Sequence, residues 1–104
     1  MPVSFGSNDA VPTNTESNVL DFTNNTGGDI ILEAIGGEAT TRSEWFIYID
    51  NVLKIKRRAS TPNPNIDIDL HRIELSNNGN IKVNVKHYIS GYQKFSAELR
   101  YNDG

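Results

Sequence analysis

The stretch Ile66-Asp67-Ile68-Asp69-Leu70-His71 decides the fold class of this chain. Apolar and polar residues alternate strictly along it, as they do in a β-strand with one buried and one solvated face. The same period of two returns at residues 81–86 and at residues 94–101, on either side of the break at Ser90-Gly91. The sequence therefore predicts an antiparallel all-β domain.

Turn-forming residues separate the predicted strands. Asparagine accounts for 13 of the 104 residues, and its side chain tolerates left-handed backbone conformations. Residues 24–28, 50–51 and 77–80 lie between apolar runs and predict tight turns. The apolar parity reverses after Leu70, which predicts a bulge or bend near His71-Arg72.

About eight short strands follow one another without a convincing helix, so we expect an antiparallel β-sandwich or a jelly-roll-like barrel over residues 19–104. Gly36-Gly37 is expected to end the strand of residues 29–35, and the proline-containing segment 59–65 is expected to form a rigid loop. Residues 1–18 are polar and predict an extended N-terminal arm without a core of its own.

Composition argues against several partners. The chain has no cysteine, which excludes a disulfide framework and a thiolate metal site. Its formal net charge of -3 provides no general attraction to nucleic acid. The first 18 residues lack the features of a secretory signal, and no apolar run approaches the roughly 20 residues that span a bilayer. We expect neither nucleic acid nor a membrane as partner.

A row of ionisable residues runs along the deciding stretch. Asp67, Asp69 and His71 would project from one face of a strand about 6.6 Å apart, a spacing that could contribute ligands to a divalent cation. A matching basic row precedes it at Lys54, Lys56 and Arg58. Cross-strand ion pairs between the two rows are the favoured interpretation, so no metal and no other cofactor is expected.

Catalytic groups are scarce. Only His71 and His87 carry side chains that ordinarily titrate near neutrality. None of the sequence patterns GxSxG, HExxH, GxGxxG or the phosphate-binding loop occurs. The sequence therefore favours a protein that is not an enzyme.

Two sets of apolar and aromatic residues are the candidate binding residues. Val3, Phe5 and Val11 interrupt the polar arm and are the candidates for contacts with a partner protein. Trp45, Tyr88 and Tyr92 could stack on sugar rings if they are exposed, which makes a carbohydrate- or receptor-binding module the alternative function.

The segments EWFIYIDNVLKIK (44–56), IDIDL (66–70) and IELSNNGNIKVNV (73–85) together resemble small accessory β-domains of bacteriophage particles. Capsid decoration (cement) proteins and tail or baseplate modules show similar hairpin and glycine-turn patterns. Asp50-Asn51 stands here where Asp-Gly is more usual. The resemblance covers residues 44–101 and identifies no functional residue.

This resemblance implies a non-enzymatic structural component of the virion. Such a protein would dock its β-domain on the capsid or tail of the phage particle. Its arm and strand edges would contact capsid or tail proteins and copies of itself, so a homo-oligomer is expected.

Overall fold

The computed structural model describes residues 2–60 and 63–103, in which it contains eight β-strands and no helix. The strands are β1 (Val3–Val11), β2 (Ser17–Thr23), β3 (Ile30–Ala39), β4 (Ser43–Ile49), β5 (Val52–Ala59), β6 (Asn63–Leu75), β7 (Asn80–His87) and β8 (Gln93–Asn102). The described residues accordingly include no helix long and apolar enough to cross a membrane.

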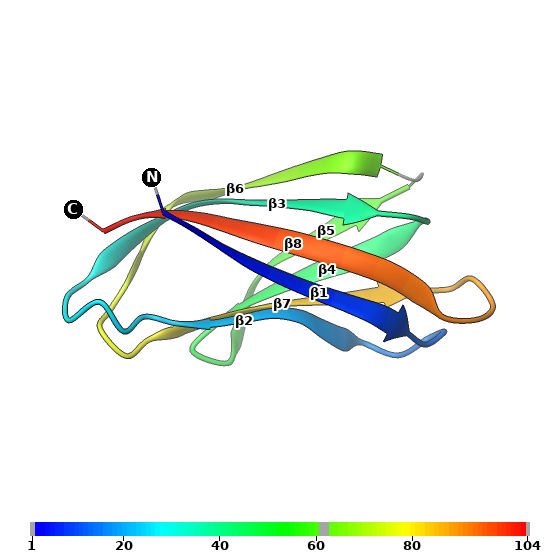
Figure 1. Ribbon diagram of the computed structural model, residues 1–104, viewed down its shortest axis with the longest axis horizontal. Helices are drawn as coiled ribbons and strands as arrows, with labels where there is room; N and C mark the ends of the chain where they lie inside the picture. The colour runs from blue at the N-terminus through cyan, green and yellow to red at the C-terminus, as the bar shows by residue number, and fades with distance from the viewer. Residues whose placement is uncertain (1, 61–62, 104) are drawn as a thin grey trace.

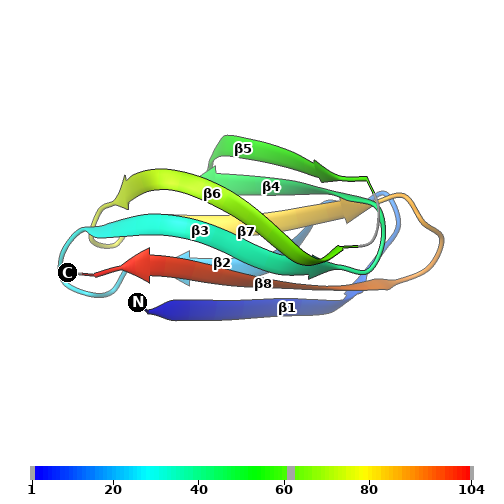
Figure 2. The same ribbon diagram turned by 90° about the horizontal axis from the view of Figure 1, so that it is seen from above.

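The strands form two antiparallel sheets of four, which confirms the predicted β-sandwich (Figure 1). The first sheet has the order β1-β8-β3-β6, and Figure 2 shows these strands side by side as one layer. The second sheet has the order β2-β7-β4-β5. The molecule is elongated along the strands, with extents of 42 × 22 × 20 Å.

Alternation along each strand builds the core between the sheets. In β7, Ile81, Val83 and Val85 are fully buried, whereas the residues between them are partly exposed. Trp45 and Ile47 of β4 point into the same core and are also fully buried. Burial of such side chains stabilises a fold by about 1.5–3 kcal/mol each, so the alternating pattern fixes which face of each strand turns inward.

The backbone confirms the predicted hairpin turn at Asp50-Asn51 and the predicted bulge, whereas residues 24–28 belong to a longer connection between the two sheets. Asp50 and Asn51 have φ angles of 49° and 66°, as a type I′ hairpin turn requires. His71 and Arg72 have φ angles of 53° and 56°, and the register of β6 with β3 shifts opposite them. The reversal of apolar parity after Leu70 therefore marks a real bulge.

The prediction that Gly36-Gly37 ends a strand is wrong, because β3 continues through both glycines to Ala39. A Cβ atom on Gly37 would lie 2.7 Å from the Ser96 carbonyl oxygen and 2.9 Å from the Trp45 ring. Gly37 therefore serves close packing inside the strand rather than strand termination.

Residues 3–11 differ from the predicted arm, because they form strand β1 at the edge of the first sheet. β1 pairs with β8 in a register that joins Val3 to Arg100 and Val11 to Gln93. Main-chain hydrogen bonds to β8 hold this polar segment in the sheet. The amino-acid composition of the segment does not indicate such pairing. The predicted boundary at residue 18 therefore does not separate an arm from the sandwich. Residues 1 and 104 lie outside the described residues, as do residues 61–62 of the predicted loop.

The expected pairing of β5 with β6 is also wrong. β5 pairs with β4 in the second sheet, and β6 pairs with β3 in the first. The basic row of β5 and the acidic row of β6 therefore lie on edge strands of opposite sheets. They do not form the expected cross-strand ladder.

Candidate docking surface

The two sheets carry opposite charge. Within the described strands, those of the first sheet hold seven Asp and Glu residues and three Lys and Arg residues, a net of -4. The described strands of the second sheet hold two Asp and Glu residues and six Lys and Arg residues, a net of +4. Because alternate side chains of a sandwich point outward, an acidic outer face lies opposite a basic one.

A shallow hollow of about 600 Å³ lies on the outer face of the first sheet. The strand register aligns Phe5 of β1 with Glu98 of β8, then Glu98 with Gly36 of β3, and finally Gly36 with Asp67 of β6. Gly36 contributes no side chain to this row, so the centre of the sheet is open. We call this hollow the saddle and define it by Phe5, Gly36, Glu38, Asp67, Glu98 and Arg100.

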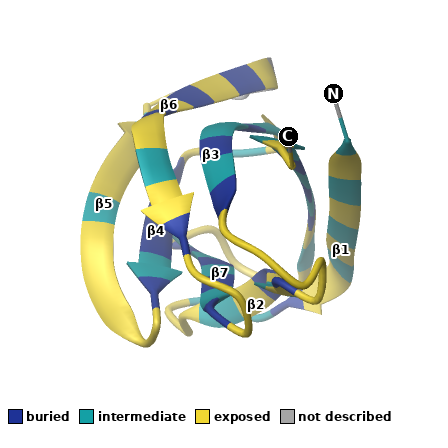
Figure 3. Ribbon diagram, turned by 90° about the vertical axis from the view of Figure 1, so that its left-hand side faces the viewer, coloured by how far each residue is buried: buried dark blue, intermediate teal, exposed yellow. Residues whose placement is uncertain are grey.

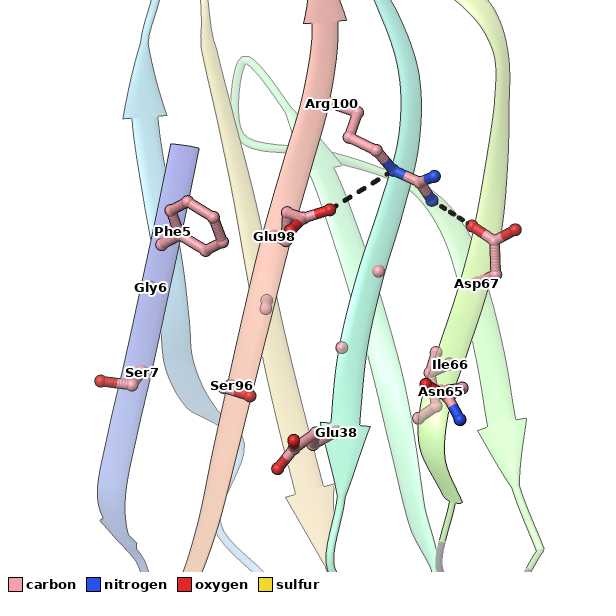
Figure 4. A pocket seen from close by; sticks show the side chains of 13 residues that line it. Phe5, Gly6, Ser7, Glu38, Asn65, Ile66, Asp67, Ser96, Glu98 and Arg100 are labelled. Atoms are coloured by element: carbon pink, nitrogen blue, oxygen red, sulfur yellow. Dashed lines mark hydrogen bonds and ion pairs between the residues drawn. The ribbon is translucent and has the colours of Figure 1, made fainter. Parts of the chain in front are cut away.

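Arg100 organises the charges of the saddle (Figure 4). Its Nη2 donates a hydrogen bond to Asp67 Oδ1, and its Nε lies 3.6 Å from Glu98 Oε1. The guanidinium thus bridges β8 and β6 across the open position of Gly36. The exposed Glu38 adds a third carboxylate. The saddle is therefore acidic, with one cation among three anions.

Apolar side chains border the saddle on the β1 side. Phe5 is 71% exposed and Val3 is 44% exposed, so two of the three candidate partner residues lie on the surface. The prediction that Val11 binds a partner is wrong, because this side chain is fully buried in the core. The register of β1 shifts between Asn8 and Val11, which turns the end of the strand inward.

The second sheet ends in an exposed basic strand. β5 carries Lys54, Lys56, Arg57 and Arg58, and the apolar Val52 and Leu53 beside them are 54% and 47% exposed. Figure 3 shows that almost the whole length of β5 is exposed. Among the described strands, β5 pairs with β4 alone. We call residues 52–58 the basic edge.

The predicted aromatic platform is only partly present. Including Trp45 in it was wrong, because this ring is fully buried and its Nε1 donates to Ser43 Oγ at 3.1 Å. Trp45 lies on the inward side of β4. Because nearly every residue of this strand is apolar, the sequence does not show which side chains face inward. Tyr92 and Tyr88 are 72% and 48% exposed and remain accessible.

A polar cluster ties Tyr88 to the second sheet. Its hydroxyl donates a hydrogen bond to Glu44 Oε1, and Lys56 Nζ lies 3.1 Å from Glu44 Oε2. The hydrogen bond from Tyr88 and then the contact with Lys56 lower the pKa of Glu44. The same carboxylate raises the pKa of the Tyr88 hydroxyl. Glu44 therefore offsets part of the positive charge of this face.

The acidic row of β6 does not converge on one point. Asp67 is engaged by Arg100, whereas Asp69 Oδ1 accepts a hydrogen bond from the His71 backbone N–H at 2.7 Å. Within residues 2–60 and 63–103, no group of three His, Asp or Glu side chains is arranged to hold a metal ion.

Sequence reasoning identified Phe5 as a candidate partner residue and Asp67 as part of an acidic row, but it missed the roles of Gly36, Glu38, Glu98 and Arg100 in the saddle. The alternation over residues 94–101 places Glu98 and Arg100 on the outward side of their strand. That signal does not show which strands lie beside β8, and the saddle arises from those neighbours. Family models, curated proteins and solved structures were compared with this chain, and none of them matches it.

Proposed function

We propose that the protein is a non-enzymatic structural component of a larger particle, and that it acts by docking its charged surfaces and strand edges on neighbouring subunits. The observation that carries this proposal is the division of charge between the two sheets, -4 on one and +4 on the other. Opposite faces of this kind orient a subunit relative to its neighbours and suppress incorrect contacts.

The edge strands support the same proposal. Strands β1 and β5 are edges of their sheets, and both expose apolar side chains. Exposed edges are sites at which proteins pair with other chains, and single-chain proteins usually cover or blunt them. Phe5 on β1 and Leu53 on β5 are therefore anchors for contacts with other subunits.

The setting that we propose is the capsid or tail of a phage particle, because residues 44–101 resemble accessory β-domains of such particles. Electron cryomicroscopy of the particles made by the source of this sequence tests the proposal. The expected result is a repeated density that fits an eight-stranded sandwich of 42 × 22 × 20 Å. A particle whose density is fully explained by other chains would contradict it.

A charge reversal makes the same experiment more specific. Glu38→Lys reverses one exposed charge of the saddle, and we expect it to lower the occupancy of the protein on the particle. Asp103→Lys makes the same change in net charge at an exposed position near the C-terminus and serves as its control. Equal occupancy of the two variants would exclude the saddle as the docking surface.

Binding of a carbohydrate or receptor is the second candidate function. The high exposure of Tyr92 and Tyr88, at 72% and 48%, favours it, because exposed aromatic rings stack on sugars. A glycan array probed with the wild-type chain and with Tyr92→Ala tests this function. Specific signals that the substitution abolishes would support it, and an array without signals would remove it.

A further inference from the structure

We propose that the saddle receives the basic edge of a second copy of this chain. The inference rests on the proposed function and identifies the partner and the two surfaces that meet. Both surfaces lie on every copy, so contact between them requires no other protein.

Charge complementarity is the first argument. The saddle holds the carboxylates of Glu38, Asp67 and Glu98 against the single cation of Arg100. The basic edge holds four cations, of which Lys56 is paired with Glu44 of β4, and the sequence of β5 itself contains no carboxylate. Complementary potentials of this kind steer association and fix the register of the two partners.

Apolar complementarity is the second argument, and it is independent of charge. Phe5 and Val3 lie at the β1 side of the saddle, and Val52 and Leu53 lie at the end of the basic edge next to its hairpin turn. All four side chains are between 44% and 71% exposed. Contact between the two apolar groups would remove both from water, which favours association.

The dimensions of the two surfaces agree. Leu53 and Arg58 are five residues apart, which corresponds to about 16 Å along an extended strand. Phe5 and Asp67 are separated by three strand spacings of the first sheet, or about 14 Å. A basic edge lying across the sheet can therefore bring Leu53 to Phe5 while Arg58 reaches the carboxylates on the β6 side.

The contact would be head-to-tail. The basic edge and Phe5 lie at opposite sides of the sandwich, as the positions of β5 and β1 in Figure 3 show. Each copy would use its saddle for one neighbour and its basic edge for another. Such heterologous contacts close into rings or continue as filaments, and both arrangements suit a repeated component of a particle.

Sedimentation velocity of the purified full chain tests the inference. At low ionic strength we expect association that increases with protein concentration. At about 1 M salt, where the screening length falls to about 3 Å, the association should weaken strongly. Glu38→Lys in the saddle and Arg58→Glu on the basic edge should each weaken it at least about tenfold, because each introduces a like-charge contact.

A mixture of these two variants is the decisive experiment. The Glu38→Lys variant keeps an intact basic edge, and the Arg58→Glu variant keeps an intact saddle. Mixed in equal amounts, they can make one wild-type contact, and the other contact would bring the two reversed charges together as an opposite-charge pair. We therefore expect the mixture to associate clearly more strongly than either variant alone at the same total concentration.

Two controls match the changes in charge. Asp103→Lys alters an exposed residue outside the saddle and the basic edge and should associate as the wild type does, whereas Lys94→Glu adds a carboxylate to the outer face of the first sheet and should not weaken association. Circular dichroism and thermal melts of every variant show whether the fold persists. If Arg58→Glu fails to fold, Lys54→Glu at another exposed position of the same edge replaces it.

Three results would each overturn the inference. They are a wild type that stays monomeric at low ionic strength, charge reversals that associate no less than their controls, and a mixture that stays monomeric. A chain that is monomeric in solution but present as a repeated density on the particle would reject this inference and retain the proposed function. Absence from the particle would reject the proposed function instead.

Discussion

The imidazole of His87 and the backbone carbonyl of Val11 are joined by a buried hydrogen bond of 2.7 Å between Nε2 and the carbonyl oxygen. A carbonyl only accepts, so Nε2 carries the proton. The Ile89 N–H donates to Nδ1 of the same ring at 3.3 Å. The ring also stacks on Phe95 with a centroid separation of 6.0 Å. His87 thus fastens the end of β1 to the second sheet.

This relationship predicts a large loss of stability in His87→Asn. The shorter amide cannot reproduce the bond from Nε2, which leaves the Val11 carbonyl without its buried donor and opens a cavity. An unsatisfied buried group of this kind costs about 1–3 kcal/mol. Urea denaturation measures the loss. His71→Asn is the matched control, because His71 is exposed and asparagine tolerates its positive φ of 53°. Equal losses in the two variants would contradict the assigned role.

Asn24 leads to a second prediction, because it joins two turns from a fully buried position. Its Nδ2 donates to the carbonyls of Gly28, Leu75 and Ser76 at 2.8–3.1 Å. Asn24→Asp keeps the shape but replaces the donor with an anion facing three carbonyl oxygens. We expect it to destabilise the fold by at least about 2 kcal/mol at neutral pH. Chemical denaturation measures this loss.

Asn25→Asp is the control for that substitution, because the neighbouring Asn25 is exposed. It should change the free energy of unfolding by less than about 0.5 kcal/mol. The loss caused by Asn24→Asp should shrink at acidic pH, where a protonated carboxyl regains a donor. A loss that is independent of pH would argue against this account.

The strands and turns were predictable because their signals are local. Alternation identified the strands around Ile68 and Val83, and asparagine and aspartate identified the hairpin turn at Asp50-Asn51. The bulge at His71-Arg72 was predictable for the same reason, because an inserted residue shifts every later side chain to the other face.

The saddle was not predictable because it depends on neighbours distant in sequence. Phe5, Glu98, Gly36 and Asp67 share one row only because β1, β8, β3 and β6 lie in that order. Strand order follows from how the two sheets bury their inward faces together, and no single segment records it. The mistaken pairing of β5 with β6 has the same origin, since matching charge rows fit several strand orders equally well.

The Glu44 cluster predicts how stability depends on pH. Hydrogen bonds from Tyr88 and then Lys56 hold the pKa of Glu44 below its ordinary value of 4.5. A carboxylate with a lowered pKa in the folded state stabilises the fold above its unfolded pKa, and this contribution disappears as the pH falls through the folded value. Glu44→Gln should therefore lower the free energy of unfolding at neutral pH by about 1 kcal/mol.

Denaturation curves between neutral and acidic pH measure this effect. The difference between wild type and Glu44→Gln should be largest above pH 4.5 and should narrow below it. The control is Glu74→Gln, which removes an exposed carboxylate outside the saddle and should leave the pH dependence unchanged. A constant difference across the whole pH range would show that the Glu44 charge does not stabilise the fold.

The adjacent glycines of β3 give the last prediction, because they face opposite sides of the sheet. A Cβ on Gly36 would meet its nearest atom, the Ile66 carbonyl oxygen, at 3.6 Å, whereas one on Gly37 would lie 2.7 Å from the Ser96 carbonyl oxygen. Gly36→Val should therefore lose less stability than Gly37→Val, since besides the Ile66 carbonyl its Cβ lies near only the ends of the Arg100 and Glu98 side chains, and it should fill the saddle and abolish self-association in sedimentation. Gly37→Val should destabilise the sandwich by at least about 2 kcal/mol in urea denaturation, because it forces the sheet away from Trp45. Two variants with equal stability would disprove the assigned orientation of these residues, and an associating Gly36→Val variant would disprove the saddle as the contact surface.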